Sequence, residues 1–162
     1  DLLRQMAAAI REASAGVSPA RDFAMLKPQT PFAAAGRAAQ RTLDPAGYRR
    51  FDGLVSTVTS MDAAAAAQVY RTIRPRLNEA YAALGNTNRD VHASVHTAID
   101  IMLDTPVVQP PVRIVVGKGA AWAYADPALE SLTPTQKQLI RMGPAHTEAI
   151  QTWLRSFKNA IQ

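Results

Sequence analysis

Apolar residues recur every three or four positions through most of the chain, which is the spacing of one face of an α-helix. The first such stripe predicts a helix over residues 1–16, with a buried face formed by Leu2, Leu3, Met6 and Ile10. This period is absent from residues 17–32, where three prolines predict an extended connector that Phe23 and Leu26 attach to the core. Residues 33–162 then make up the main part of the domain.

Helix start signals divide the middle of the chain. Asp44 and Pro45 are typical of a helix N-terminus, because the aspartate accepts hydrogen bonds from free backbone amides and proline has no N–H to satisfy. Two further helices are predicted over 62–84 and 88–104, and Pro75 inside the former is expected to kink or break it. The faces expected to be buried are Tyr48, Phe51, Leu54, Val55 and Val58 after Pro45, and Val91, Val95, Ala98, Ile99 and Met102 in 88–104.

Two stretches have the features of β-hairpins. Residues 112–125 combine a β-branched run, a turn that contains two glycines, and an aromatic run that places Trp122 and Tyr124 on one face. Residues 32–44 show a weaker alternation around a Gly-Arg pair, which permits a second and shorter hairpin.

Capping residues mark three helices near the C-terminal end. Asp126 begins a short helix, the capping box from Thr133 to Gln136 begins a second that ends at Gly143, and Pro144 begins the last. The apolar stripe of the last helix is Ala149, Ile150, Trp153, Leu154 and Phe157. The whole pattern predicts a mainly α fold, a single compact helical domain over 1–162 with about six helices and one or two small β-hairpins.

Composition narrows the classes of protein. The chain has no Cys, which excludes disulfide scaffolds, zinc–thiolate sites, iron–sulfur clusters and thiol nucleophiles. No apolar run approaches the roughly 18 residues needed to cross a bilayer. The first residue is Asp1 rather than Met, so a signal peptide or membrane anchor is an expected upstream segment. No cofactor and no metal are predicted.

Positive charge is concentrated in one part of the chain. The protein has 18 basic and 13 acidic residues, and residues 37–76 contain seven Arg against three Asp. These arginines lack interleaved aromatic residues and lysine runs, so the pattern predicts no specific nucleic-acid partner. Solvated helix faces account for most such charge, and the alternative is a patch for an anionic partner. The candidate binding residues are Arg49, Arg50, Tyr70, Arg71, Arg74, Tyr81, Gln136, Lys137 and Arg141.

Two other site hypotheses remain open. His92, His96 and Asp100 follow one another at four-residue spacing on a predicted helix, which would place three possible metal ligands along one stripe, although the first and third lie two turns apart. An enzyme with a dispersed site, such as a hydrolase of cell-wall material, would use Asp100 or Glu130 with a neighbouring tyrosine. No recognised catalytic or phosphate-binding motif supports the second hypothesis.

Four motifs in register give the chain a resemblance to a known family. They are LDPAGYRRFD at 43–52, YRTIRPRLNEAYAALG at 70–85, AIDIMLDTP at 98–106 and ADPALESLTPTQKQLIRMGP at 125–144. In order and spacing they resemble the bacterial family called domain of unknown function 3014. The resemblance implies a Gram-negative envelope protein that carries an N-terminal membrane anchor and a proline-rich linker before this domain, and it implies no catalytic residue.

These observations favour a non-enzymatic binding or scaffolding domain, and the family resemblance implies that it lies on the periplasmic side of the inner membrane. The expected partner is a protein or an anionic polymer of the cell envelope, bound through an Arg-rich face around Arg49, Arg50, Arg71 and Arg74 or through the kink at Tyr70, Pro75 and Tyr81. Contact with the membrane itself is expected only through the anchor.

Overall fold

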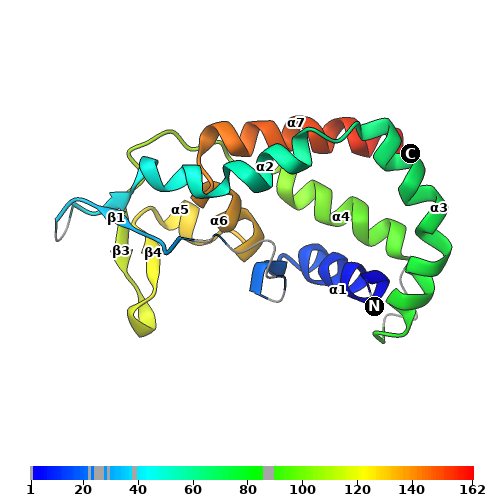
Figure 1. The fold of residues 1–162 in the computed structure, drawn as a ribbon. Coiled ribbons are helices and arrows are strands. Elements are labelled where there is room, and N and C mark those ends of the chain that lie inside the picture. Colours follow the sequence, from blue (N-terminus) through cyan, green and yellow to red (C-terminus); the bar gives the residue numbers. More distant parts are fainter. Residues whose placement is uncertain (1, 22, 24–27, 29, 38–39, 86–89) are drawn as a thin grey trace.

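The helices and hairpins follow the sequence signals closely. The computed structural model describes residues 2–21, 23, 28, 30–37, 40–85 and 90–162. Its elements are α1 (Leu2–Ser14), η1 (Pro19–Arg21), β1 (Ala34–Ala35), β2 (Thr42–Leu43), η4 (Pro45–Phe51), α2 (Asp52–Thr59), α3 (Ala63–Ala82), α4 (Val91–Leu103), β3 (Ile114–Val116), η5 (Lys118–Ala120), β4 (Trp122–Tyr124), α5 (Pro127–Glu130), α6 (Pro134–Arg141) and α7 (Pro144–Ala160). The described part thus confirms the mainly α fold with two small hairpins. In Figure 1 the hairpins lie at one end of an elongated molecule and α3 lies at the other.

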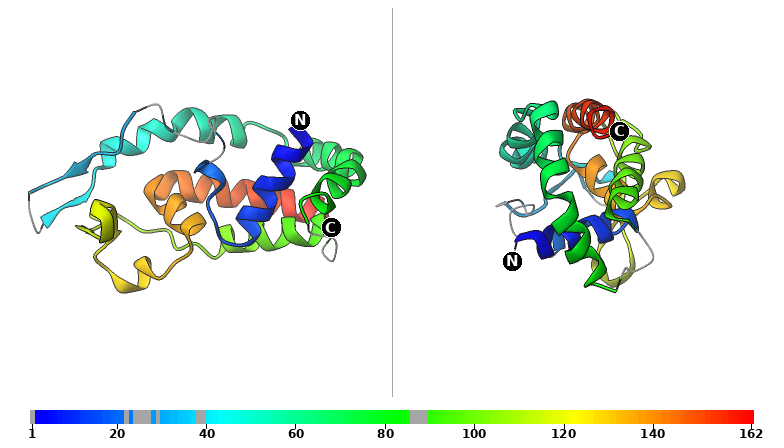
Figure 2. Two further views of the ribbon diagram at one scale, coloured as in Figure 1. Left: turned by 90° about the horizontal axis from the view of Figure 1, so that it is seen from below. Right: turned by 90° about the vertical axis from the view of Figure 1, so that its right-hand side faces the viewer.

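The larger core lies among α1, α3, α4 and α7. On α4, the predicted face is confirmed, since Val91, Val95, Ala98 and Ile99 are buried at helical spacing. α7 adds Leu154, which is buried, and Trp153 and Phe157, which are half-buried against the same core. Figure 2, in the view from below, shows α1 lying across α3 and α4. Burial of these apolar faces is the main force that holds the four helices together.

A polar side chain of α7 closes the end of α4. Gln151 is 4% exposed, and its Nε2 donates to the backbone carbonyls of Met102, Leu103 and Thr105 at 3.1, 3.2 and 2.8 Å. The last carbonyls of a helix have no partner within the helix. The Met102 carbonyl also accepts from the amides of Asp104 and Thr105, whereas Gln151 is the donor to the carbonyls of Leu103 and Thr105 among the described residues.

The two hairpins join at the opposite end of the molecule. β1 pairs antiparallel with β2, and β3 pairs antiparallel with β4, which confirms both predicted hairpins. Backbone bonds from Leu43 N to Val112 O and from Ile114 N to Arg41 O link the hairpins to each other. Their buried residues form a second core with α6, made of Leu43, Val112, Ile114, Tyr124 and Ile140.

The helix predicted after Asp44 has two parts. A 3₁₀ segment, η4, begins where the Asp44 carboxylate accepts from the amide of Ala46, and α2 continues from it. Phe51 and Val55 are buried against Leu139 of α6 and against Met142, which follows this helix, while Tyr48, Leu54 and Val58 are half-buried. This segment therefore lies over α6 and joins the hairpin end to the helical end.

Some predicted details differ from the structure. Leu2 is 70% exposed, because Leu3, Met6 and Ala7 supply the contact face of α1 and Leu2 falls at its edge in the first turn. α3 is one continuous helix through the exposed Pro75, so of the predicted kink or break, the break is absent. The helix therefore tolerates the one backbone bond that the proline cannot donate. The predicted helix start at 88 and the predicted contact of Leu26 lie outside the described residues.

Candidate functional site

The candidate binding residues occupy different parts of the molecule. Tyr70, Arg71, Arg74 and Tyr81 lie on α3, whereas Arg49 and Arg50 lie on η4 near the hairpins. Figure 1 shows these two elements toward opposite ends. Gln136, Lys137 and Arg141 lie on α6, which η4 and α2 cover. The structure thus brings Arg50 and Arg141 together and keeps the α3 group apart from them.

The α3 group is engaged in contacts that hold helices together. The Tyr70 hydroxyl lies 3.0 Å from Nδ1 of His92, and the Tyr81 hydroxyl lies 2.8 Å from the buried Ser94 Oγ. Arg71 donates to the carbonyl of Ala160 at the end of α7. Burial raises the pKa of Tyr70 to about 12, so this phenol stays protonated at neutral pH. Both tyrosines therefore act as polar contacts between α3 and α4.

The histidine stripe on α4 has other partners. The rings of His92 and His96 are edge-to-face with centroids 4.6 Å apart, and Asp100 pairs with Lys158 of α7. Burial, followed by the neighbouring His96 and Arg74, lowers the pKa of His92. Among the residues the structure describes, no three His, Asp or Glu side chains gather as a metal site would require.

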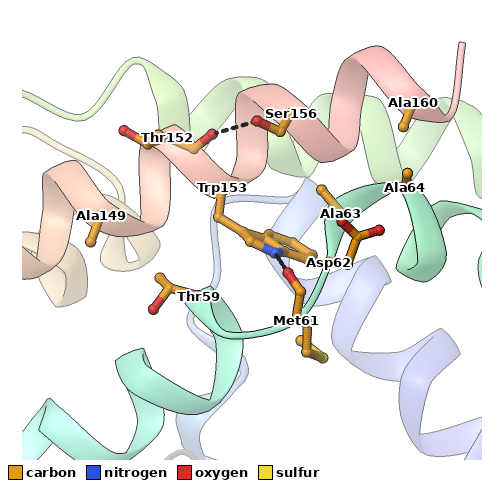
Figure 3. Close-up of a pocket in the computed structure, with 10 residues that line it drawn as sticks. All are labelled: Thr59, Met61, Asp62, Ala63, Ala64, Ala149, Thr152, Trp153, Ser156 and Ala160. Carbon is orange, nitrogen blue, oxygen red and sulfur yellow. Dashed lines mark hydrogen bonds between the residues drawn. The ribbon is translucent and has the colours of Figure 1, made fainter.

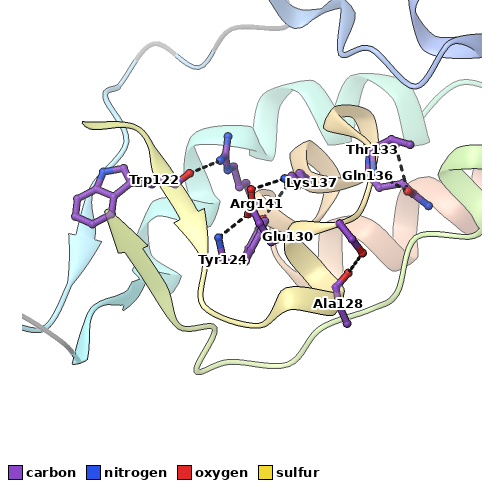
Figure 4. Close-up of polar contacts among 9 residues, drawn as sticks. Trp122, Tyr124, Ala128, Glu130, Thr133, Gln136, Lys137 and Arg141 are labelled. Carbon is purple, nitrogen blue, oxygen red and sulfur yellow. Dashed lines mark hydrogen bonds and ion pairs between the residues drawn. The ribbon is translucent and has the colours of Figure 1, made fainter. Parts of the chain in front are cut away.

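The carboxylates considered for catalysis are ion-paired. Oε1 of Glu130 lies 2.7 Å from Nζ of Lys137, and its Oε2 accepts from the amide of Tyr124 (Figure 4). The hydrogen bond from Lys137 is the main cause that lowers the pKa of Glu130. A general acid needs the opposite shift. This pair instead fastens β4 and α5 to α6.

α6 is held rigidly at both ends. Thr133 and Gln136 form the predicted capping box at its start, and Gln136 is buried. At its end, Nη2 of Arg141 donates to the carbonyl of Trp122 at 3.2 Å, as Figure 4 shows, and the guanidinium lies 6.0 Å from the ring centre of Tyr124. These contacts fix the position of Arg141 beside β4.

A pocket of about 270 Å³ lies where η4, β4 and α6 meet. Its walls are aromatic and its charged groups are both cations. We call it the arginine–aromatic pocket and define it by Phe32, Arg50, Phe51, Trp122 and Arg141. The central carbon of the Arg50 guanidinium lies over two rings, 5.3 Å from the centre of Phe32 and 4.8 Å from that of Phe51. Such cation–π contacts hold a guanidinium while its N–H groups remain hydrogen-bond donors.

Among the described residues, neither arginine of this pocket forms an ion pair with a carboxylate. Nε of Arg50 is buried and has no hydrogen-bond partner within the described part of the chain. Burial, and then the charge of the nearby Arg141, lower the pKa of Arg50. Two acids lie nearby but bond to other groups: Asp44, which lines a small adjoining space, accepts from the amide of Ala46, and Glu130 accepts from Lys137. An anion between the two guanidiniums would relieve this repulsion.

A small extension of the pocket adds a hydroxyl group. Tyr48, Asp44 and Leu43 line it together with Arg50 and Arg141. The Tyr48 hydroxyl is buried and, over the described residues, has no hydrogen-bond partner. Burial followed by the charge of Asp44 raises the pKa of Tyr48, so it is available as a donor. The extension therefore places a second kind of donor beside the two cations.

Sequence reasoning missed the aromatic walls of the pocket. Phe32 and Trp122 come from different hairpins, with ring centres 6.2 Å apart. Gly143 was recognised as a helix end, but its tight contact was not. A Cβ at Gly143 would lie 2.5 Å from the ring of Tyr48, so only glycine allows η4 this close to the end of α6. This approach is what brings Arg50 and Arg141 together.

A second hollow lies between the α2–α3 corner and α7. It is open, has a volume of about 680 Å³, and is lined mainly by Ala, Thr and Ser around Trp153 (Figure 3). Nε1 of Trp153 donates to the carbonyl of Met61 at 2.8 Å, and its ring stacks on Phe157 with centroids 5.1 Å apart. Within the described residues that line it, the single charged side chain is Asp62, and the amide of Ala65 donates to it. This hollow therefore has few polar or charged groups that could bind a ligand specifically.

The comparisons with known proteins give one result. None of the described helices is both long and apolar enough to cross a membrane. No curated protein and no solved structure matches the chain. The family model described as "Protein of unknown function (DUF3014)" matches residues 2–158, nearly the whole chain. The chain therefore belongs to this family, domain of unknown function 3014.

Proposed function

We propose that this chain is a non-enzymatic binding domain that recognises an anionic group of its ligand in the arginine–aromatic pocket. The observation that carries the proposal is the buried Nε of Arg50, which faces a second arginine and has no partner among the described residues. A buried donor left unpaired lowers the stability of the free protein. Such an arrangement is expected where a ligand supplies the missing acceptor.

The location belongs to the same proposal. We infer that the domain works on the periplasmic side of the inner membrane, with an anchor upstream of these residues. A protein or an anionic polymer of the envelope, expected from the sequence, would offer carboxylate or phosphate groups of the required charge. Arg49, which is exposed on the same segment, and Arg41, whose guanidinium lies 5.1 Å from the ring centre of Trp122, add positive charge around the entrance.

The test is anion binding by matched arginine variants. Acetate and inorganic phosphate are titrated into the protein and followed by NMR chemical shifts at low salt. Arg50→Gln removes the cation without disturbing the bonds of Arg141, and Arg155→Gln removes an exposed arginine of α7 as the control. We expect binding to weaken at least tenfold in the first variant, as for a lost charge-assisted bond, and to persist in the second. Equal binding by both variants and the wild type would refute the proposal.

A further inference from the structure

An apolar pocket adjoins the arginine–aromatic pocket. It has a volume of about 220 Å³. Its lining is almost entirely hydrocarbon and comes from α2, α4, α6 and α7: Leu54, Val58, Met102, Leu139, Met142, Ile150 and Leu154. Ser18, Pro19 and Ala20 of the connector complete one side. No described charged side chain lines it.

The two pockets meet at Gln138 of α6, which lines both of them. The η4–α2 segment also contributes to both, with Arg50 and Phe51 in the first pocket and Leu54 and Val58 in the second. Arg50 and Leu54 are four residues apart along η4 and α2, which is roughly 6 Å along a helix axis. A cationic end and an apolar end therefore follow each other directly along one segment.

The size of the pockets favours a single occupant. Ligand pockets for small molecules usually exceed about 300 Å³ and combine apolar walls with a few polar groups. Each pocket alone, at about 270 and 220 Å³, is smaller than this, whereas the two together exceed it. Their chemistry is complementary as well, because one holds the charge and the other holds almost no polar surface.

We propose that the two pockets together bind a single-chain anionic amphiphile. Its carboxylate or phosphate head lies between Arg50 and Arg141, and its unbranched alkyl chain lies against Leu54 and Val58. The inference rests on the proposed function, because it keeps the same anion site, and it adds the class of the ligand. A polymer that carries charge without an alkyl chain would fill only the first pocket.

The experiment is a chain-length series measured by titration calorimetry. The probes are butyrate, hexanoate, octanoate and decanoate, each below the concentration at which it forms micelles. Octyl phosphate replaces the carboxylate head, so it separates the two possible heads, and octanol removes the charge. We expect affinity to rise about fourfold for each added methylene until the chain fills the apolar pocket. We expect octanol to bind at least tenfold more weakly than octanoate.

Variants that fill the apolar pocket test whether the alkyl chain of the ligand binds there. Val58→Phe fills this pocket, and Val69→Phe places the same side chain on an exposed position of α3 as the control. Ala20→Leu fills it from the connector side, so the result does not depend on one variant folding. The ratio of octanoate to butyrate affinity should fall at least fivefold in both filling variants and stay constant in Val69→Phe.

The outcomes separate this inference from the proposed function. Loss of butyrate and octanoate binding in Arg50→Gln, with a chain-length dependence that the filling variants remove, supports both. If Arg50→Gln abolishes binding but chain length and the filling variants have no effect, the amphiphile is refuted and the anion site stands. If octanoate binds equally well to Arg50→Gln, or no probe binds, both are refuted.

Discussion

Gln151 is expected to contribute several kilocalories per mole to stability. Its side-chain amide has two N–H donors, and these serve three backbone carbonyls at the end of α4 from a position that is 4% exposed. Gln151→Met keeps the length of the side chain and removes both donors. Met102 O keeps the amides of Asp104 and Thr105 as donors. Two carbonyls, those of Leu103 and Thr105, therefore lose their donor. At roughly 1–2 kcal/mol for each, we expect a total loss of about 2–4 kcal/mol.

Urea denaturation followed by circular dichroism measures this loss directly. In a thermal melt of the same variant, the melting temperature should fall by about 5–15 °C, given the length of the chain. Gln68→Met, on an exposed position of α3, is the matched control and should change stability by less than about 0.5 kcal/mol. A loss below about 1 kcal/mol for Gln151→Met would refute the assigned role.

A charged variant at the same position adds a pH test. In Gln151→Glu the carboxylate would be buried against carbonyl oxygens, so its pKa in the folded protein should rise above the ordinary value of about 4.3. The protonated form can donate a hydrogen bond and the ionised form cannot. The penalty relative to wild type should therefore be small below about pH 4.3 and grow as the pH rises through the folded pKa. A penalty that does not change with pH would contradict this reading.

Three further variants test other contacts. Thr135→Val should stabilise the protein by about 1 kcal/mol, because the buried hydroxyl of Thr135 has no partner among the described residues; a loss of stability would contradict this. Gly143→Ala should lower the free energy of unfolding by about 2–5 kcal/mol, because the alanine would have a positive φ and its Cβ would clash with Tyr48. Gly85→Ala, at φ 88 in open space, should lower it by about 1 kcal/mol through backbone strain alone. Equal losses in the two variants would show that the contact with Tyr48 has no effect on stability. Burial lowers the pKa of His92, so protonation of this side chain opposes folding. The free energy of unfolding of the wild type should therefore fall as the pH drops from 7 to 5. An equal fall in the His92→Gln variant would refute this explanation.

The local features of the fold could be predicted because their causes are local. Asp44, Asp62 and Thr133 cap helices through side-chain bonds to amides two or three residues on, and each is found in that role. The buried face of α4 follows from apolar spacing alone. Continuity of α3 through Pro75 could not be predicted, because the backbone cost of a proline is local and the packing that offsets it is not.

The candidate site depends on contacts between distant segments. Phe32, Arg50, Trp122 and Arg141 meet only because the two hairpins join and because Gly143 lets η4 approach α6. The sequence marks the arginines as charge and the aromatic residues as core, without indicating that they share a pocket. The same limit applies to the two α3 tyrosines, which the sequence marks as candidate binding residues at the expected kink, whereas both are buried in polar contacts with α4.

The most direct measurement is the NMR signal of the Arg50 Nε–Hε group, assigned by its absence from Arg50→Lys. This group is buried without a partner in the described structure of the free protein. The account predicts that octanoate shifts this signal downfield in a saturable manner, as a new hydrogen bond to a carboxylate requires, while the signal of the exposed Arg155 does not move. An Arg50 signal that is unchanged at saturating octanoate would contradict the account.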